Sequence, residues 1–168
     1  MKIEESSYYH VYNRGNNKEL IFFQENDYIH FLDHFIKYVK PFIEVYAYCL
    51  MSNHFHFFLR IKDKAGFEKG IKNFFISYVK HINFKYERVG SLFQGRYKVS
   101  RITSDSYFTR VITYIHQNPL SLPLVTKLED YKYSSYQEYL TDEPSQLNKE
   151  EVINWFGNLE QFIINHQF

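Results

Sequence analysis

Two histidines lie close together in an apolar run of the sequence. His54 and His56 belong to the segment HFHFFLRI, residues 54–61, which is typical of a β-strand. Because side chains alternate across a strand, both imidazoles project from one face, about 6.6 Å apart along it, close enough to bind one ion. Hydrogen-bonded surface histidines fit the same spacing, so the pair alone leaves both interpretations open. If helices cover the other face, the histidines lie on the accessible one.

A tyrosine and an asparagine form a second candidate pair in the segment YIHQNP, residues 114–119. Tyr114 and Asn118 are four residues apart, so on a helix they share one face at the edge of the apolar stripe. An ordinary tyrosine phenol has a pKa of about 10 and is a poor nucleophile at neutral pH unless a group takes its proton. No such base is identifiable, and His116 points to a different side of the helix. A core tyrosine with a hydrated hydroxyl is the alternative interpretation.

The charge of the chain is polarised, although the net charge is only +1. Residues 60–101 hold 11 Lys and Arg against 3 Asp and Glu, whereas residues 129–160 hold 2 against 8. A basic segment interleaved with aromatic residues is typical of nucleic-acid binding, and a solvated helix face is the alternative. The loop SLFQGRYK, residues 91–98, has cations for phosphates and rings for bases, or is an ordinary loop entering a strand. The predicted DNA-binding residues are Arg14, Lys69, Lys72, Lys80, Phe93, Arg96, Tyr97 and Lys98, with Tyr78 as a further stacking ring.

The elements that must position these residues follow from the hydrophobic periodicity. Aromatic and β-branched runs predict strands at 8–14, 43–51, 54–61 and 96–102. Apolar residues at helical spacing predict helices from Asn26 or Asp27 to Val39, over 67–82, and from Thr103 or Ser104 to Asn118, where Pro119 ends the third. The order β-α-β-β-α-β followed by a helix predicts an α+β, ferredoxin-like fold: a central antiparallel sheet with helices on one face and a C-terminal helical extension.

The composition indicates one globular domain in a reducing compartment. The chain has 168 residues, including 16 Tyr, 17 Phe and 1 Trp, which is ample for a core and leaves open a surface that stacks on planar ligands. No apolar run approaches the ~18 residues of a membrane span, and the N-terminus MKIEESSYYH has no apolar signal segment. The single cysteine, Cys49, cannot form an internal disulfide. We therefore expect a cytoplasmic protein with no membrane contact.

Five motifs in fixed order resemble those of the HUH single-tyrosine transposases. They are HVYNRG (10–15), MSNHFHFFLR (51–60), GSLFQGRYK (90–98), YIHQNP (114–119) and YKYSSYQEY (131–139). The resemblance covers roughly residues 8–140 and is nearest to the REP-associated tyrosine transposases and the short transposases of insertion sequences. It implies a catalytic domain over 1–128. The apolar residues of the C-terminal part predict a helical extension over 129–168, packed on the same domain, with Trp155, Phe156 and Phe162 as packing residues.

The resemblance also assigns a role to each candidate residue. His54 and His56 match the metal-binding histidine pair, Asn118 the residue that completes the metal site, and Tyr114 the nucleophile. The family binds a divalent ion, here Mg²⁺ or Mn²⁺, and cleaves single-stranded DNA with a 5′-phosphotyrosine and a free 3′-hydroxyl as products. It usually acts as a homodimer on hairpins at element ends or REP sequences. After Pro119, relatives tend to carry a small, basic stretch, whereas residues 120–124 here are LSLPL.

Two other functions are compatible with parts of the pattern. A non-catalytic or domesticated protein that binds hairpin DNA or RNA would use the same fold, although RYKVSRI lacks the glycine–aromatic signature of an RNA-recognition sheet. A zinc hydrolase of small phosphoesters would need a third strong ligand and a base, and the spacing of the histidines offers neither.

Overall fold

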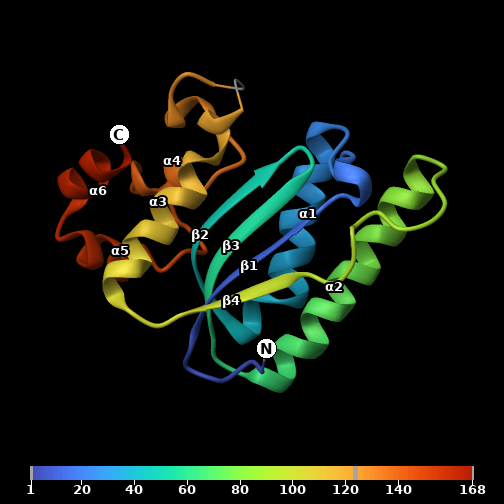
Figure 1. Cartoon of the computed structure of the whole chain (residues 1–168), viewed down its shortest axis with the longest axis horizontal. Coiled ribbons are helices and arrows are strands. Elements are labelled where there is room, and N and C mark those ends of the chain that lie inside the picture. Colours follow the sequence, from blue (N-terminus) through green and yellow to red (C-terminus); the bar gives the residue numbers. More distant parts are fainter. Residues whose placement is uncertain (1, 123–124, 168) are drawn as a thin grey trace.

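A four-stranded antiparallel sheet forms the centre of the molecule (Figure 1). The structure is a computed structural model that describes residues 2–122 and 125–167. The strands are β1 (Tyr8–Arg14), β2 (Ile43–Met51), β3 (His54–Ile61) and β4 (Lys98–Ile102). They lie in the order β2-β3-β1-β4, and each neighbouring pair is antiparallel. The predicted α+β fold with a ferredoxin-like sheet is confirmed, with β4 beginning two residues later than expected.

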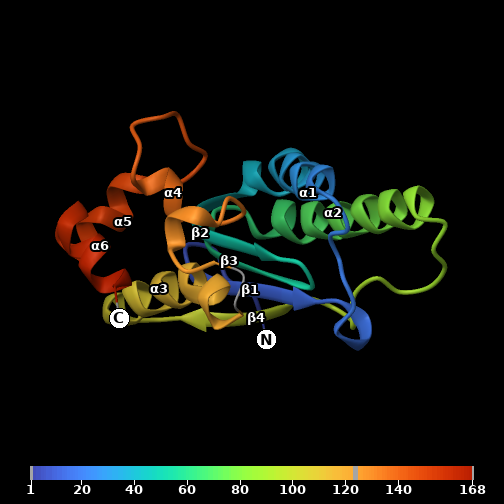
Figure 2. The same cartoon turned by 90° about the horizontal axis from the view of Figure 1, so that it is seen from above.

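Helices α1 (Glu25–Tyr38) and α2 (Lys64–Lys85) lie side by side on one face of the sheet, as Figure 2 shows. Phe35 of α1 stacks on Phe57 of β3 with ring centroids 4.1 Å apart, and Phe31 contacts Phe55 at 5.2 Å. From α2, Phe75 reaches Phe55 at 6.0 Å. Alternate residues of β3 therefore supply a core layer beneath α1 and α2. The others, the predicted histidine pair among them, face the opposite side of the sheet.

The remaining helices are α3 (Asp105–Ser121), α4 (Tyr136–Tyr139), α5 (Lys149–Phe156) and α6 (Leu159–His166). They lie on that opposite face, along the free edge of β2, or against α3 and α5. Phe58 of β3 contacts Phe108 of α3 at 5.5 Å and Trp155 of α5 at 6.1 Å. The predicted packing residues of the C-terminal segment do lie in or against the core: Trp155, Phe156 and Phe162. This packing covers much of the face that we expected to be accessible, and it buries His56.

The third helix continues through its proline. We expected Pro119 to end the helix at Asn118, but α3 runs to Ser121 with Pro119 inside it, so that prediction is wrong. Pro119 has no N–H for the carbonyl of Ile115 four residues earlier. The side-chain amide of Asn118 lies 3.5 Å from that carbonyl and donates to the carbonyl of Tyr114 at 2.8 Å, so it partly replaces the missing donor.

Connections between these elements are short. Single-turn 3-10 helices lie at Asn16–Lys18, Lys40–Phe42 and Leu128–Asp130. Of the unusual segment after Pro119, Pro123 and Leu124 lie outside the described residues. Among the helices that the structure describes, none is long and apolar enough to cross a membrane.

Candidate active site

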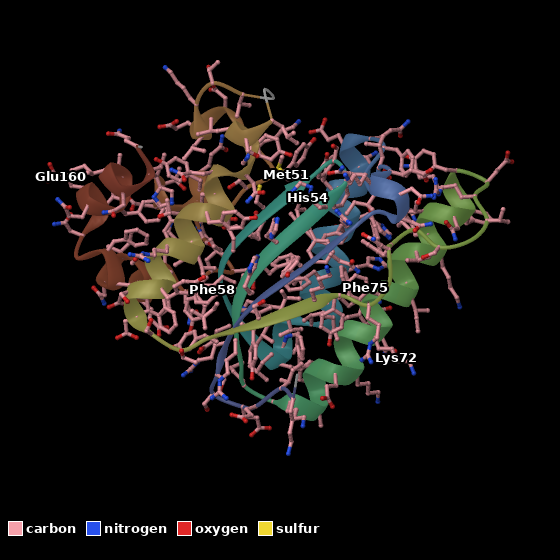
Figure 3. All side chains as sticks on the ribbon, in the orientation of Figure 1. Met51, His54, Phe58, Lys72, Phe75 and Glu160 are labelled. Atoms are coloured by element: carbon pink, nitrogen blue, oxygen red, sulfur yellow. The ribbon has the colours of Figure 1, made fainter. Side chains whose placement is uncertain are left out.

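The β2–β3 hairpin presents the two histidines at one end of the sheet. β3 begins at His54, directly after the Ser52-Asn53 turn, and its register places His54 opposite Arg14 and His56 opposite Tyr12 of β1. Figure 3 shows His54 near the end of the sheet where β2 and β3 meet. The His54 and His56 rings lie 5.2 Å apart on the same side of β3, somewhat closer than the rise of about 6.6 Å between alternate strand residues.

His54 is held between two amide side chains. Its Nδ1 lies 2.7 Å from Oδ1 of Asn53, whose own amide nitrogen donates to the carbonyl of Lys18, so Nδ1–H of His54 is the donor. Its Nε2 lies 3.4 Å from Oδ1 of Asn118. Burial lowers the pKa of His54, which favours the neutral ring, although the Asn118 oxygen, which can accept a hydrogen bond from the protonated ring, raises the pKa in part. In the neutral ring, Nε2 has no hydrogen, so two lone-pair donors face each other.

His56 is held by a third histidine. Nε2 of His10, on β1, lies 2.8 Å from Nδ1 of His56. Burial lowers the pKa of His10 to about 4; burial, together with the neighbouring His10 and His54, lowers that of His56 to about 3. Both rings are therefore neutral at pH 7, and one of them donates to the other. The sequence pattern did not identify His10, because only the pairing of β1 with β3 brings it to the pair.

Tyr114 projects over the histidines from α3. Its ring centroid is 5.6 Å from that of His56 and 6.1 Å from that of His10, and it meets both rings edge-on. The side chain is 54% exposed, while the next residue, Ile115, is fully buried and fixes the helix on the sheet. The structure thus brings together the residues singled out on β3 and α3. Their chemical roles stay predictions.

A cleft of about 590 Å³ opens beside Tyr114, His54 and His56. Four cationic residues line it: Arg14, Lys18, Arg96 and Lys98. No carboxylate lines the cleft within residues 2–122 and 125–167. Three of these cations were predicted to contact DNA, and Lys18 was not. A cationic cleft without acidic residues attracts a polyanion to the exposed phenol.

The other predicted DNA-binding residues lie apart from this cleft or are buried. Lys69, Lys72 and Lys80 are exposed on α2. Phe93 is only 6% exposed and packs edge-on against Phe75 at 5.1 Å, so the prediction that it stacks on bases is wrong. Tyr78 is fully buried and donates to the carbonyl of Ile21 at 2.6 Å, which overturns its stacking role too. Tyr97 is half-buried and stacks on Phe75 at 5.7 Å.

The donor atoms at this site fit a hard or borderline divalent cation. In the part of the chain that the structure describes, no group of three or more His, Cys, Asp or Glu residues is placed to hold a metal ion. A metal here would therefore depend on the Asn118 amide oxygen besides His54 and His56. Two imidazole nitrogens and one amide oxygen suit Mn²⁺, and Mg²⁺ less well, whereas a zinc hydrolase would need a third strong ligand. The facing lone pairs of His54 and Asn118 are the arrangement that a shared cation stabilises.

Comparison with known proteins agrees with this geometry. The model of the IS200-like transposase family matches residues 4–118, a range that includes all four residues singled out above. Among solved structures, the complex of a REP-associated tyrosine transposase with a REP hairpin has the same fold, with a TM-score of 0.67, 14% sequence identity and 86% of each chain covered. No curated protein matches the chain. The resemblance of the motifs is confirmed, and the chain belongs to the family of IS200-like transposases.

Proposed function

We propose that this protein is a metal-dependent endonuclease and transposase that cleaves and rejoins single-stranded DNA through a 5′-phosphotyrosine on Tyr114. One observation carries the proposal: an exposed phenol stands beside two neutral imidazoles and an amide oxygen, at the edge of a cleft lined by four cationic residues. A phosphodiester repels an anionic nucleophile, so a cleaving site needs positive charge around the phosphate and a nucleophile that water and DNA can reach.

The reaction exchanges one phosphodiester for another. The Tyr114 oxygen attacks the phosphorus and loses its proton, the bond from phosphorus to the 3′ oxygen breaks, and that oxygen leaves as a 3′-hydroxyl. In the rejoining step a 3′-hydroxyl attacks the phosphotyrosine and Tyr114 regains its proton. Because the numbers and kinds of bonds are unchanged, no nucleotide cofactor is required. A divalent ion, Mg²⁺ or Mn²⁺, held by His54, His56 and Asn118 would neutralise phosphate oxygens as a Lewis acid.

Each candidate ligand has a second contact that fixes its orientation. We infer that His56 donates its Nδ1–H to His10, leaving Nε2 as the lone-pair donor, just as His54 donates Nδ1–H to Asn53. The Asn118 amide nitrogen donates to the carbonyl of Tyr114, which turns Oδ1 toward His54. Such outer contacts set the tautomer and direction of metal ligands. His10 and Asn53 are therefore positioning residues.

The proposed substrate is a single strand that folds into a hairpin. Two observations support this substrate: the solved relative is bound to a REP hairpin, and four cationic residues line the cleft beside Tyr114. We assign backbone contacts to Arg14, Arg96 and Lys98 in the cleft and to Lys69, Lys72 and Lys80 on α2, with Tyr97 beside them. We further propose action as a homodimer, and residues 129–168 as an extension of the catalytic domain over 1–128.

The test is transfer of labelled DNA to the protein. Single-stranded DNA from the flanks of the protein's own gene, labelled at either end, is incubated with Mn²⁺ and resolved on a denaturing gel. The 3′ label should move with the protein and the 5′ label should appear on a released fragment. Tyr114→Phe should abolish the transfer with little loss of binding, whereas Tyr107→Phe, which alters another exposed tyrosine of α3, should leave it unchanged.

Two results would overturn the proposal. Transfer that persists in Tyr114→Phe would remove the nucleophile from this account. Hairpin binding without any cleavage in Mn²⁺ would favour a non-catalytic hairpin-binding protein on the same fold.

A further inference from the structure

The outer side of α2 carries an exposed line of alternating cationic and apolar residues. Lys72, Ile76, Lys80 and Phe84 follow one another at intervals of four, so they lie along one side of the helix over about 18 Å. Ile76 is 45% exposed and Phe84 is 88% exposed. We call these four residues the α2 stripe. The buried residues of α2, such as Tyr78, lie on its other side, so the stripe contributes nothing to the core.

Phe84 points to solvent from the last turn of α2, and this turn is fixed to the rest of the molecule by hydrogen bonds. Lys85 and the hydroxyl of Tyr86 both contact the buried carboxylate of Asp27 at 2.7 Å, which ties the helix end to α1. In the last turn of α2, the backbone carbonyl of Asn83 accepts a hydrogen bond from the backbone N–H of Arg88, and its side-chain amide donates to the carbonyl of Gly90. Figures 1 and 2 show this end of α2 projecting beyond the sheet.

The charges beside the stripe favour an anionic partner. No carboxylate lies within ion-pair distance of Lys72 or Lys80 among the described residues. The stripe borders a groove of about 1280 Å³ between α2 and β4. Among the described residues, five cationic side chains and one acidic side chain, Glu68, line this groove. Figure 3 shows Lys72 on the outer side of α2 and Phe75 toward the sheet. A partner that fits must therefore combine regularly spaced negative charge with a planar apolar group, which is the chemistry of nucleic acid with unpaired bases.

The groove adjoins the cleft at Tyr114. Asn13, Gly95 and Arg96 line both hollows, and the Asn13 amide donates to the Gly95 carbonyl at 3.0 Å at their junction. β4 is an edge strand of the sheet, and among the described residues no further strand lies beyond it. One nucleic-acid chain can therefore contact α2 and reach Tyr114 around the β4 edge.

We propose that the α2 stripe is a second DNA-contact site, at which Lys72 and Lys80 contact phosphates and Phe84 stacks on an unpaired base of the folded strand. The site anchors the hairpin away from the phosphate that is cut. The inference rests on the proposed function, because it names where the same substrate is held. Stacking on an exposed ring makes Phe84 specific for unpaired bases, whereas the two lysines bind any phosphate backbone.

The experiment measures binding separately from cleavage. Hairpin DNA from the gene's own flank, with 2-aminopurine at each unpaired position in turn, is titrated with Tyr114→Phe protein in EDTA. We expect Phe84→Ala in this background to weaken binding on the order of tenfold and to abolish the quenching of one 2-aminopurine. Phe84→Trp should restore both. Val89→Ala, which alters a 95% exposed residue in the adjoining turn, is the matched control and should change neither.

The contribution of Lys72 and Lys80 is tested by measuring how the affinity for DNA depends on salt concentration. Lys72→Ala with Lys80→Ala should lower the slope of log affinity against log salt by about 1.4, as expected for two lost single-strand phosphate contacts, with the 2-aminopurine signal at saturation retained. Wild-type affinity and quenching in Phe84→Ala would overturn the inference, as would a change in oligomeric state instead of affinity. If wild-type protein forms the covalent adduct but Phe84→Ala binds normally, only the inference fails; if no adduct forms at all, the proposed function fails first.

Discussion

Two clusters of neutral histidines flank α3, and they differ in how their nitrogens are satisfied. At the Tyr114 side, His54 turns Nε2 toward another lone-pair donor, the oxygen of Asn118. On the other side of the helix, His116 is fully buried and both its nitrogens have partners at 2.8 Å, His166 and Ser135. A buried histidine whose nitrogens are all paired is structural. A histidine such as His54, whose Nε2 lone pair faces no hydrogen-bond donor and lies beside an exposed phenol, is a candidate metal ligand.

The second cluster, which consists of His116, His166 and Ser135 and which we call the sealed cluster, shows that residue types alone do not identify an active site. Ser135, His116 and His166 form a hydrogen-bonded chain of the kind that activates serine nucleophiles. Yet Ser135 is fully buried and also accepts a hydrogen bond from the backbone of Tyr48, so no substrate reaches its hydroxyl. The chain instead joins α6 and the segment before α4 to α3, and so supports the helix that carries Tyr114.

We call the histidines beside Tyr114, namely His10, His54 and His56, the open cluster. The largest expected effect of a substitution is the loss of cleavage activity when one of these histidines is replaced. His56→Ala should reduce Mn²⁺-dependent cleavage about a thousandfold, because one of the three candidate ligands is lost. Because His56 is itself buried and paired with His10, its replacement also lowers stability, so circular dichroism must first show that the variant is folded under the assay conditions. Cleavage is measured on the labelled single strand at saturating DNA. Unchanged cleavage, with or without chelator, would remove His56 from the site.

His10 tests whether the outer contacts of the open cluster matter. His10→Phe removes the partner of His56 and should weaken Mn²⁺ binding about 10- to 100-fold, as loss of a positioning contact does. His10→Gln, which keeps a polar partner, should recover part of that loss. Electron paramagnetic resonance of free Mn²⁺ follows the binding directly, without any DNA. Equal affinity in all three proteins would show that His10 merely fills the core.

Substitution in the sealed cluster should affect folding rather than chemistry. His116→Ala leaves a cavity and unpaired groups on Ser135 and His166, and should lower the free energy of unfolding by about 3 kcal/mol. Urea unfolding followed by circular dichroism measures this change. The folded fraction should still form the covalent adduct. Loss of adduct formation in fully folded His116→Ala protein would give the sealed cluster a chemical role.

The free energy of unfolding should depend on pH differently in the wild type and in a variant of the sealed cluster. Burial lowers the pKa of His166 to about 4 in the folded state, against 6.5 for an ordinary histidine. The unfolded chain therefore binds the extra proton first, and stability falls as the pH drops from 6.5 toward 4. His166→Gln should make that decline shallower, by on the order of 2 kcal/mol across the window. Identical pH profiles of urea unfolding would contradict the burial of a neutral ring.

Local spacing was enough to single out four candidate residues that the structure brings together, and only tertiary packing reveals their neighbours. His54 with His56, and Tyr114 with Asn118, are pairs within one strand and one helix, so their periodicity places them correctly. His10 joins them only through the pairing of β1 with β3.

The errors have equally local causes. Pro119 stays helical because the Asn118 amide partly replaces the missing backbone donor. Aromatic residues beside basic ones look alike in sequence whether they face the core, as Phe93 does, or solvent, as Phe84 does. Only the orientation of α2 and of the loop after it distinguishes them.

The central claim is that Tyr114 is the residue that becomes joined to DNA. The direct measurement is mass spectrometry of the protein after incubation with Mn²⁺ and single-stranded DNA from its own flanks, nuclease trimming and proteolysis. We predict a nucleotide adduct on the peptide that contains Tyr114, with fragment ions that place it on that residue. An adduct on Tyr107 or on any other residue, or cleaved DNA with no adduct at all, would contradict the account.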